Sequence, residues 1–340
     1  MNAPDSVFVI AEIGSNHNGD LELAHLMIDH AAESGAQAAK FQTFAADTLY
    51  SVRAPRLEEM KNFAGVEDDV TPHQLAGKLE MDRAWLPELA SHCNDVGIEF
   101  MSTPFDLSAV DELDPLVARH KIASFDVDNR ELLEKVAACG KPIVLSTGHS
   151  YLGEVEAALG WIDAVDPNVE VTLLQCTNQY PTEPDDVHLR AMVTLREAFG
   201  TPVGLSDHTL GIDVSLGAVA LGATTLERHV TEDVNSPGPD HRFALEPDEV
   251  TALVQGCEKI SRALGSARKV PTAAEAENRQ LARRSIHVRG DVAAGTELTR
   301  DHLLLVRPAL GIPPYELDKV IGRTLAKDKL AGEPLQWQDV

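Results

Sequence analysis

Two histidines stand at equivalent places in consecutive strand-like segments. His208 follows an apolar run that starts at Pro202, and His229 follows the next apolar run, 21 positions later. A stretch of small residues with helical character separates the two runs, so the segment reads as a βαβ unit. Because parallel strands end at the same edge of a sheet, we expect both imidazoles at the carboxyl edge, where α/β folds place their ligands.

Acidic residues flank both histidines: Asp207, Glu227 and Asp240. Two neutral imidazoles brought together could hold a divalent metal and leave coordination positions open for a substrate. A single histidine at a strand end is more often a cap or the partner of a loop carbonyl. Two histidines at matching ends of neighbouring strands favour the metal site, with His208 and His229 as its ligands.

The other predicted strands also end in polar side chains. The residues expected at the carboxyl edge, besides the two histidines, are Glu12, Lys40, Gln42, Thr103, Lys121, Ser124, Ser146, Asn178 and Ser206. Lysines with Ser, Thr and Asn donors suit a phosphate and a carboxylate on one small ligand. Lys40 or Lys121 could instead form a Schiff base, or could pair with a buried acid. Spacing alone does not separate these interpretations.

Repeated strand and helix segments must position these side chains. Apolar runs predict strands at residues 7–14, 38–44, 99–105, 121–125, 142–148 and 169–177, before the two strands that end near His208 and His229. Helical spacing occurs at residues 21–34, 85–96, 110–117, 130–139, 153–165, 189–199 and 247–264. Eight repeats in about 265 residues match a (β/α)8 TIM barrel. A doubly wound open sheet is the alternative, but no GxGxxG follows the first strand.

Two parts of the chain depart from this alternation. Residues 45–71 are largely polar and are expected to lie over the carboxyl end of the barrel. After the barrel, residues 1–267, a polar, Ala-rich linker spans 268–284, and residues 285–340 form short strands with turns. A domain of roughly 55 residues buries little core, so we expect it to dock on another surface.

Composition limits the classes of partner. The chain of 340 residues has a net charge of -25, which argues against nucleic acid and anionic membrane surfaces as partners. No apolar run is long enough to span a membrane, and the N-terminus lacks the pattern of a signal peptide. The four cysteines are scattered without a CxxC pair, which predicts reduced thiols in a cytoplasmic protein.

Nine short motifs occur in order along the barrel segment. They are AEIGSNHNG (11–19), KFQTF (40–44), STPFD (102–106), KIASF (121–125), LSTG (145–148), CTNQYPT (176–182), GLSDHT (204–209), ERHVT (227–231) and GPDH (238–241). Together they resemble the N-acetylneuraminate (sialic acid) synthase family. The C-terminal segment VRPALGIPPYELDKVIGRTL resembles the SAF, or antifreeze-like, domain of that family. The resemblance covers nearly the whole chain.

The resemblance implies a TIM barrel and a SAF domain that condense phosphoenolpyruvate with an N-acyl hexosamine. The acceptor would be N-acetylmannosamine or a related 2,4-diacetamido sugar, and the products would be a nonulosonic acid and phosphate. The metal would be Mn²⁺, with Mg²⁺ or Co²⁺ as alternatives, on His208 and His229. Phosphoenolpyruvate would be held by Lys40, Thr103, Lys121, Ser124, Ser146, Asn178 and Ser206.

The same resemblance implies roles for the remaining candidates. Glu12, Gln42, Tyr180 and Asp240 would face the acceptor sugar, and Glu12 or Asp240 would move a proton. Arg307 would reach into the barrel of the partner subunit in a domain-swapped homodimer and bind the N-acyl group. Both substrates are small molecules, so neither nucleic acid nor a membrane is an expected partner.

Departures from the family pattern leave the acceptor open. Arg228 stands where the family usually has Lys, and His149 where Met is common. Legionaminic, pseudaminic and 9-phosphate synthases share the same core motifs. A Schiff-base aldolase and a non-catalytic saccharide- or ice-binding protein are the more distant alternatives. The other histidines weighed are expected to be loop or surface residues and not ligands: His17, His92, His120, His188, His241 and His287.

Overall fold

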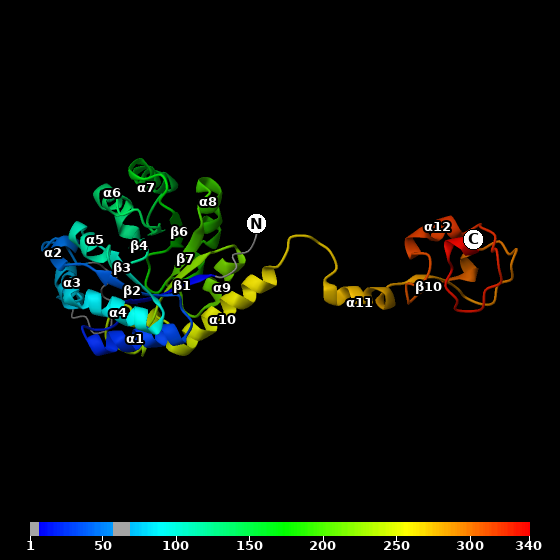
Figure 1. Cartoon of the computed structure of the whole chain (residues 1–340), viewed down its shortest axis with the longest axis horizontal. Coiled ribbons are helices and arrows are strands. Elements are labelled where there is room, and N and C mark those ends of the chain that lie inside the picture. Colours follow the sequence, from blue (N-terminus) through cyan, green and yellow to red (C-terminus); the bar gives the residue numbers. More distant parts are fainter. Residues whose placement is uncertain (1–6, 57–68) are drawn as a thin grey trace. The chain divides into compact units, whose positions relative to one another are not determined.

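The computed structural model describes residues 7–56 and 69–340. The chain divides into two compact units, Met1–Gly265 and Ser266–Val340 (Figure 1). Part of the predicted polar insertion, residues 57–68, lies outside the described residues. Within the described part, every helix is too short or too polar to cross a membrane.

Eight parallel strands line the interior of the first unit. They are β1 (Phe8–Gly14), β2 (Ala38–Thr43), β3 (Glu99–Pro104), β4 (His120–Ile122), β5 (Ile143–Ser146), β6 (Val171–Cys176), β7 (Val203–Asp207) and β8 (Thr225–His229). The strand order is β3-β2-β1-β8-β7-β6-β5-β4, and each paired neighbour is parallel. Because β3 and β4 also lie beside each other, the sheet is a near-closed, TIM-like barrel. The predicted fold is confirmed.

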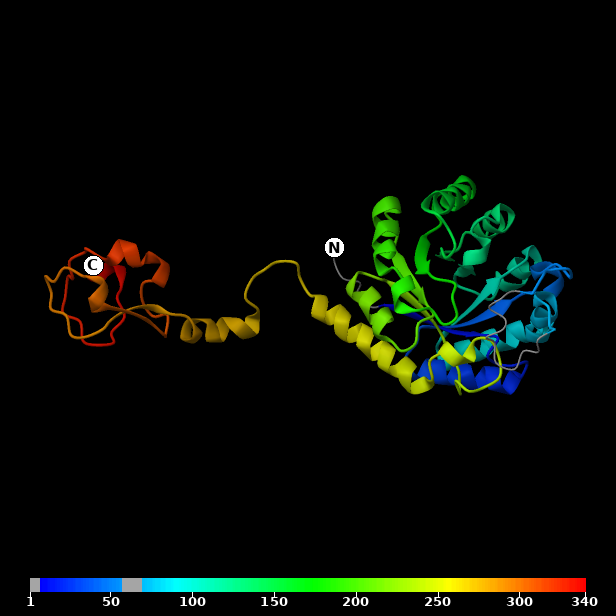
Figure 2. The same cartoon turned by 180° about the vertical axis from the view of Figure 1, so that it is seen from behind.

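Helices cover the outside of this sheet (Figures 1 and 2). They are α1 (Leu21–Glu33), α4 (Leu86–Val96), α5 (Leu107–Leu113), α6 (Arg130–Ala137), α7 (Leu152–Val165), α8 (Leu189–Phe199), α9 (Asp213–Ala220) and α10 (Pro247–Leu264). Two further helices, α2 (Ala46–Leu49) and α3 (Pro72–Leu79), contribute side chains to the cavity described below. Helix α6 illustrates why these segments are helical. Asn129 caps its first turn, and Leu132, Leu133 and Val136 form one buried stripe against the barrel.

Three local differences from the sequence prediction have physical causes. Strand β4 ends at Ile122 because residues Ser124–Asp126 turn into a 3-10 helix. Helix α5 begins before the predicted Val110 because the Asp106 carboxylate caps it, accepting a hydrogen bond from the Ala109 backbone. The predicted polar insertion contains the short helix α2, and α3 follows it from a capping box at Thr71, with Pro72 in the first turn.

The second unit begins with the helix α11 (Ala273–Ala282), inside the segment predicted as a linker. Strands β9 (Ser285–Val288) and β10 (Leu303–Val306) form an antiparallel pair, and α12 (Leu317–Val320) is a single turn. Its small core includes Ile286, Leu303 and Leu335. A small domain with one two-stranded sheet confirms the expected architecture of the C-terminal part.

Candidate active site

The two-residue period of the strands builds the site in layers. Ile10, Ala38, Met101, Val144 and Leu174 are buried together as an apolar layer inside the barrel. Two positions further along each strand, on the same face, come Glu12, Lys40, Thr103, Ser146 and Cys176. The barrel interior therefore changes from apolar to polar toward the carboxyl edge.

A cavity of about 430 Å³ opens above this polar layer. Every predicted site residue of the barrel lines it: Glu12, Lys40, Gln42, Thr103, Lys121, Ser124, Ser146, Asn178, Tyr180, Ser206, His208, His229 and Asp240. Arg307 follows β10 in the second unit, so its predicted role is separate from the residues that the barrel itself assembles. The cavity lies at the edge where TIM-barrel enzymes carry their chemistry.

Buried ion pairs hold two lysines on the cavity floor. Lys40 Nζ lies 2.6 Å from Glu12 Oε2 and 3.7 Å from Glu227 Oε2, and Lys121 Nζ lies 3.5 Å from Glu227 Oε1. Lys40 also donates to Thr103 Oγ1 and Lys121 to Ser146 Oγ, at 3.1 and 2.9 Å. The lysines are thus fixed, with hydroxyl groups beside them, before any anion binds.

Burial and charge set the protonation of this network. Burial alone raises the pKa of Glu227, but Lys121 and Lys40 outweigh it and bring that pKa to about 2. Burial and the charge of Glu227 raise the pKa of Glu12, and together they outweigh the lowering effect of Lys40. Burial lowers the pKa of Lys121, whereas Glu12 and Glu227 outweigh burial at Lys40 and raise its pKa. Glu227 is therefore ionised and part of the lysine network. The sequence analysis had noted it only as an acidic residue beside the histidines.

The two predicted imidazoles face each other at the end of β7 and β8. Their ring centroids are 5.4 Å apart. His208 Nδ1 donates to the Thr177 carbonyl at 2.9 Å, which leaves the lone pair on Nε2. Burial lowers the pKa of His208 to about 4, and burial together with His208 holds the pKa of His229 well below its usual value. Both rings are therefore neutral at pH 7, the form that binds a metal.

The donor set fits a divalent metal. Metal-binding histidines commonly fix their other ring nitrogen on a backbone carbonyl, as His208 does with Thr177. His229 Nδ1 is buried without a hydrogen-bond partner among the described residues, and Asp240 Oδ2 lies 3.7 Å from it. An orphaned buried nitrogen next to a carboxylate is a position that a cation would satisfy.

Aromatic rings hold these imidazoles in place. Phe243 is buried and packs edge-on against both histidines, with ring centroids 5.9 Å from His208 and 5.0 Å from His229. The Tyr180 ring lies 4.4 Å from that of His208 and 5.5 Å from that of Phe243. Sequence reasoning missed Phe243, because an isolated Phe in a short 3-10 turn looks like any core residue.

The carboxyl group of Asp240, beside His229, has a raised pKa. Burial and the charge of Glu12 raise the pKa of Asp240 to about 7. Gln42 Nε2 donates to Glu12 Oε1 at 2.6 Å, so the carboxylate of Glu12 has a fixed orientation toward the cavity. Two carboxyl groups of raised pKa and two neutral imidazoles therefore surround one space.

Asp207 and Arg228 lie on the other face of their strands. Arg228 Nη1 binds Asp207 Oδ2 at 2.7 Å, and Nη2 donates to the Thr209 carbonyl at 2.7 Å. Both side chains are about 1% exposed. Arg228 supports the loop that carries His208 and stays outside the cavity lining, so the unusual Arg alters the framework and not the chemistry.

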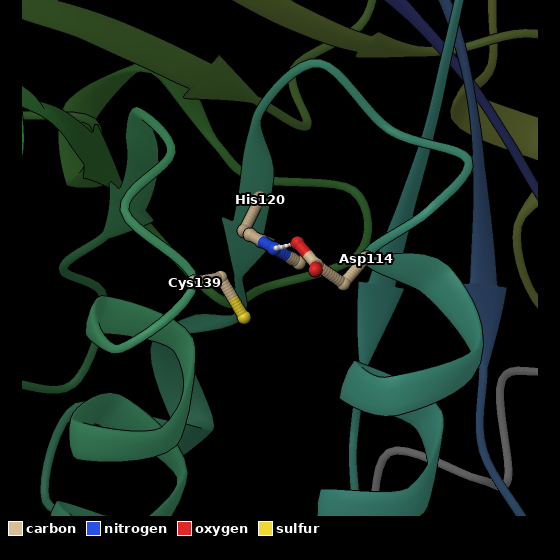
Figure 3. Close-up of side chains that lie close together, drawn as sticks. All are labelled: Asp114, His120 and Cys139. Carbon is tan, nitrogen blue, oxygen red and sulfur yellow. Dashed lines mark hydrogen bonds and ion pairs between the residues drawn. The ribbon is translucent and has the colours of Figure 1, made fainter.

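A second cluster of possible metal ligands lies at the start of β4, the amino edge of the barrel (Figure 3). Among the described residues, the three side chains whose ligand atoms lie within 4.8 Å of one another are Asp114, His120 and Cys139. His120 is fully buried at the start of β4, and His287 is buried in β9, which corrects their expected place in a loop or on the surface. Lys141 Nζ already binds Asp114 Oδ1 at 3.0 Å, so the carboxylate is neutralised by a lysine.

Comparison with known proteins gives two family matches. The model of the NeuB family matches residues 27–269, and that of the SAF domain matches residues 283–340. The chain is 42% identical over 343 residues to N,N'-diacetyllegionaminic acid synthase of Legionella pneumophila, covering 98% of this chain and 94% of that protein. It is 36% identical over 327 residues to human N-acetylneuraminate-9-phosphate synthase, covering 93% and 88%.

A solved structure is similar as well. It is an N-acetylneuraminic acid (sialic acid) synthetase from Leptospira borgpetersenii in complex with citrate, with a TM-score of 0.72 and 34% identity over 80% of this chain and 90% of that chain. The family match spans most of the barrel, including the strands that carry the two imidazoles and the lysines. The chain therefore belongs to the NeuB family, the phosphoenolpyruvate-dependent nonulosonic acid synthases, and ends in a SAF domain.

Proposed function

We propose that this enzyme condenses phosphoenolpyruvate with an N-acyl hexosamine to give a nonulosonic acid and phosphate. The acceptor is N-acetylmannosamine or a related 2,4-diacetamido sugar. The observation that carries the proposal is a single cavity lined both by Lys40 and Lys121 and by two neutral imidazoles, His208 and His229. Family membership supplies the two substrate classes, phosphoenolpyruvate and an amino sugar.

The anionic substrate belongs on the lysine side. Phosphoenolpyruvate carries a phosphate and a carboxylate, which suit two ammonium groups with hydroxyl and amide donors around them. Those donors are Thr103, Ser124, Ser146, Asn178 and Ser206. Since Glu12 and Glu227 pair with the lysines, the substrate would replace part of these ion pairs and would not have to order free side chains.

His208 and His229 are proposed to hold the divalent metal that the NeuB family uses, with Mn²⁺ as the preferred ion and Mg²⁺ or Co²⁺ as alternatives. When bound, the ion supplies Lewis acidity to the aldehyde oxygen of the acceptor. The residues of the chain do the rest of the positioning. Thr177 fixes the tautomer of His208, and Phe243 keeps both rings facing the cavity.

The condensation forms one carbon–carbon bond and releases phosphate. Carbon 3 of phosphoenolpyruvate attacks the aldehyde carbon, carbon 2 gains oxocarbenium character, and water adds there. Glu12 and Asp240 are proposed to hold and move the protons of the water and of the new hydroxyl group. Lys40 and Lys121 stabilise the negative charge of the departing phosphate. One sugar, one phosphoenolpyruvate and one water are thus converted into one nonulosonic acid and one phosphate.

The second unit is proposed to complete the site in a domain-swapped homodimer. Arg307 follows β10 and is the cation that would bind the N-acyl group in the barrel of the partner subunit. Gln42 and Tyr180 line the cavity near Glu12 and the histidines, where the sugar would lie. All four cysteines are unpaired, in keeping with the proposed cytoplasmic location.

One assay tests the proposal. The enzyme is incubated with phosphoenolpyruvate, Mn²⁺ and a panel of 2-acetamido and 2,4-diacetamido hexoses, phosphate release is measured, and the product mass is determined. We expect equal amounts of phosphate and a nonulosonic acid with at least one sugar. Covalent trapping of pyruvate on Lys40 or Lys121 by borohydride, without phosphate release, would instead identify a Schiff-base aldolase.

A further inference from the structure

Asn178 carries a buried amide nitrogen at the wall of the cavity. The residue lies two positions after the end of β6 and lines the cavity. Within residues 7–56 and 69–340, its Nδ2 atom has no hydrogen-bond partner, although the atom is buried. Buried amide groups are normally hydrogen-bonded, because an unpaired one has lost its hydration and gained no partner. An unpaired donor at this place is therefore a group that a bound ligand can satisfy.

Backbone contacts fix the loop that carries Asn178. The Thr177 carbonyl accepts the hydrogen bond from His208 Nδ1 at 2.9 Å. Thr182 Oγ1 donates to the Gln179 carbonyl at 2.7 Å, and Thr182 N donates to the His208 carbonyl at 2.9 Å. The residues on both sides of Asn178 are thus held, so the direction of its amide is set by rotation of the side chain.

The Cys176 thiol fixes one end of this amide. Its Sγ donates to Asn178 Oδ1 at 3.0 Å. Burial raises the pKa of the thiol to about 11, although a hydrogen bond from Ser124 and the charge of Lys121 act in the opposite direction. The thiol is therefore protonated at pH 7 and has a hydrogen to donate. Because Oδ1 faces the thiol, the NH2 group of the amide is turned away from it.

Gly148 leaves the space in which the amide lies. It is buried two residues beyond β5, and its backbone N donates to Ser124 Oγ at 2.9 Å. A Cβ atom at this position would lie 2.8 to 2.9 Å from Oδ1, Cγ and Nδ2 of Asn178, which is closer than packed atoms approach. Gly148 lacks the positive φ that favours glycine, so the place of the amide is what requires it.

The amide lies on the side of the cavity that carries the lysines. Gly148 comes two residues after Ser146, which accepts a hydrogen bond from Lys121 Nζ at 2.9 Å. Ser124, the partner of Gly148, lines the same cavity. Next to an ammonium group, a neutral N–H donor adds a directed hydrogen bond for one oxygen of a phosphate or carboxylate. An anionic oxygen is thus the acceptor that suits Asn178 Nδ2.

We propose that Cys176 and Gly148 are positioning residues that hold the Asn178 amide with its NH2 group directed at an anionic oxygen of phosphoenolpyruvate. This inference rests on the proposed function, in which Asn178 is one of the donors to that substrate. It goes further by explaining why a thiol and a glycine stand beside the donor. Both act on the substrate through Asn178.

The dissociation constant of phosphoenolpyruvate tests this, measured by isothermal titration calorimetry without acceptor sugar. Cys176→Ala removes the donor to Oδ1 and should raise the constant about 5-fold, since one neutral hydrogen bond is worth about 2- to 12-fold. Cys176→Ser keeps a donor and should stay within about twofold of the wild type. Equal losses in the two variants would mean that Cys176 acts by packing alone and would overturn its role.

A second variant tests the space beside the amide. Gly148→Ala should displace the amide and raise the dissociation constant at least about 10-fold, because a hydrogen bond to a charged oxygen is lost. Gly160→Ala is the matched control, at an exposed glycine of α7 where the added Cβ meets no described atom within 4 Å. It should leave the constant unchanged. Thermal melts of each variant check folding.

Double variants test whether both residues act through Asn178. Asn178→Ala removes the amide, and with it the group that a Cβ at position 148 would meet. In that background, neither Cys176→Ala nor Gly148→Ala should weaken phosphoenolpyruvate binding by more than about twofold. Full additional losses would overturn the inference, because they would show that the two residues act elsewhere.

The outcomes separate this inference from the proposed function. If the wild type does not bind phosphoenolpyruvate, the proposed function fails and the inference fails with it. If the wild type binds it, but Cys176→Ala and Gly148→Ala bind it equally well, the proposed function stands and the positioning roles are wrong. If Gly148→Ala does not fold, the comparison of Cys176→Ala with Cys176→Ser still decides.

Discussion

The barrel places histidines beside acids at both of its ends, and the two clusters are built differently. At the carboxyl edge, His208, His229 and Asp240 surround an open cavity, and one ring nitrogen of His208 is fixed by a backbone carbonyl. At the amino edge, His120 Nε2 pairs with Asp114 (Figure 3), and Lys141 also binds Asp114. His120 Nδ1, like His229 Nδ1, is buried without a hydrogen-bond partner among the described residues, so an unpartnered nitrogen alone does not make a site. The clusters differ because the carboxyl-edge rings line a cavity, whereas Lys141 binds the carboxylate at the amino edge.

Lysines have opposite effects in the two clusters. At the carboxyl edge, Lys40 and Lys121 are balanced by Glu12 and Glu227, so the imidazoles and Asp240 keep their lone pairs for a ligand. At the amino edge, Lys141 takes the carboxylate that a metal would need. Burial also raises the pKa of the Cys139 thiol, which opposes the thiolate form that binds metals. The amino-edge cluster is therefore interpreted as a structural ion pair.

The largest expected effect comes from removing one imidazole of the carboxyl edge. His208→Ala should lower kcat/KM for phosphate release at least about 1000-fold, because several kcal/mol of charge stabilisation at the aldehyde depend on that ligand. The matched change at the other edge, His120→Ala, should leave kcat/KM within about twofold. Steady-state kinetics at saturating Mn²⁺ measures both, and a thermal melt checks folding. Comparable losses in the two variants would erase the distinction between the edges.

Metal binding should follow the same division. After a chelator has removed any bound metal, we expect the wild-type chain to bind one added Mn²⁺ per barrel. Electron paramagnetic resonance of the free ion measures this binding. His229→Ala should weaken that binding at least about 100-fold, because one of two imidazole ligands is lost. Cys139→Ser should bind Mn²⁺ like the wild type. Weaker binding in Cys139→Ser than in His229→Ala would place the ion at the amino edge.

Removing a lysine should also separate the two regions, through stability. Lys121→Met leaves Glu227 with one lysine partner in a buried network and should reduce the free energy of unfolding by about 3 kcal/mol. It should also raise KM for phosphoenolpyruvate, since a phosphate donor is lost. Lys141→Met, next to the 38% exposed Asp114, should cost less than about 1 kcal/mol. Urea unfolding measures both, and equal costs would mean that the floor network is no more tightly coupled than a surface pair.

The smallest expected effect is a pH dependence at the amino edge. Burial raises the pKa of Asp114, but hydrogen bonds from Lys141 and His120 outweigh it and lower that pKa below 3.8. A carboxylate with a lowered pKa in the folded state stabilises the fold above its unfolded pKa, and the gain is lost as pH falls below about 4. For a partly exposed group this amounts to less than about 1 kcal/mol. The difference in melting temperature between wild type and Asp114→Asn should therefore shrink between pH 5 and pH 3, and a constant difference would contradict the assignment.

The fold and much of the carboxyl-edge cluster could be predicted from the sequence, for a local reason. Strand alternation and the common direction of parallel strands are enough to bring Glu12, Lys40 and His208 to one edge. What the sequence did not reveal depends on contacts between distant segments. Phe243 packs on the histidines from a short turn, and His120 is fully buried at the start of β4.

The rim of the cavity shows the same limit. Residues 45–71 were expected to lie over the carboxyl end of the barrel, and Leu49 and Tyr50 of this segment line the cavity. Leu75, Ala76 and Leu79 of α3, which follows the segment, line it as well, and the sequence analysis did not predict this. Arg307 remains a prediction from family resemblance, because its predicted role involves a partner subunit. Local patterns thus predict where strands end, and they do not predict which side chains from other segments cover those ends.

The metal dependence of phosphate release tests most directly whether the carboxyl-edge histidines form the centre of this enzyme. Chelated enzyme is mixed with phosphoenolpyruvate and each acceptor sugar, with and without restored Mn²⁺, for the wild type and for His208→Ala. We predict phosphate and a nonulosonic acid in equal amounts from the wild type with Mn²⁺, and neither product from the chelated wild type or from His208→Ala. Full activity of chelated enzyme, or of His208→Ala, would contradict the assignment of this histidine pair.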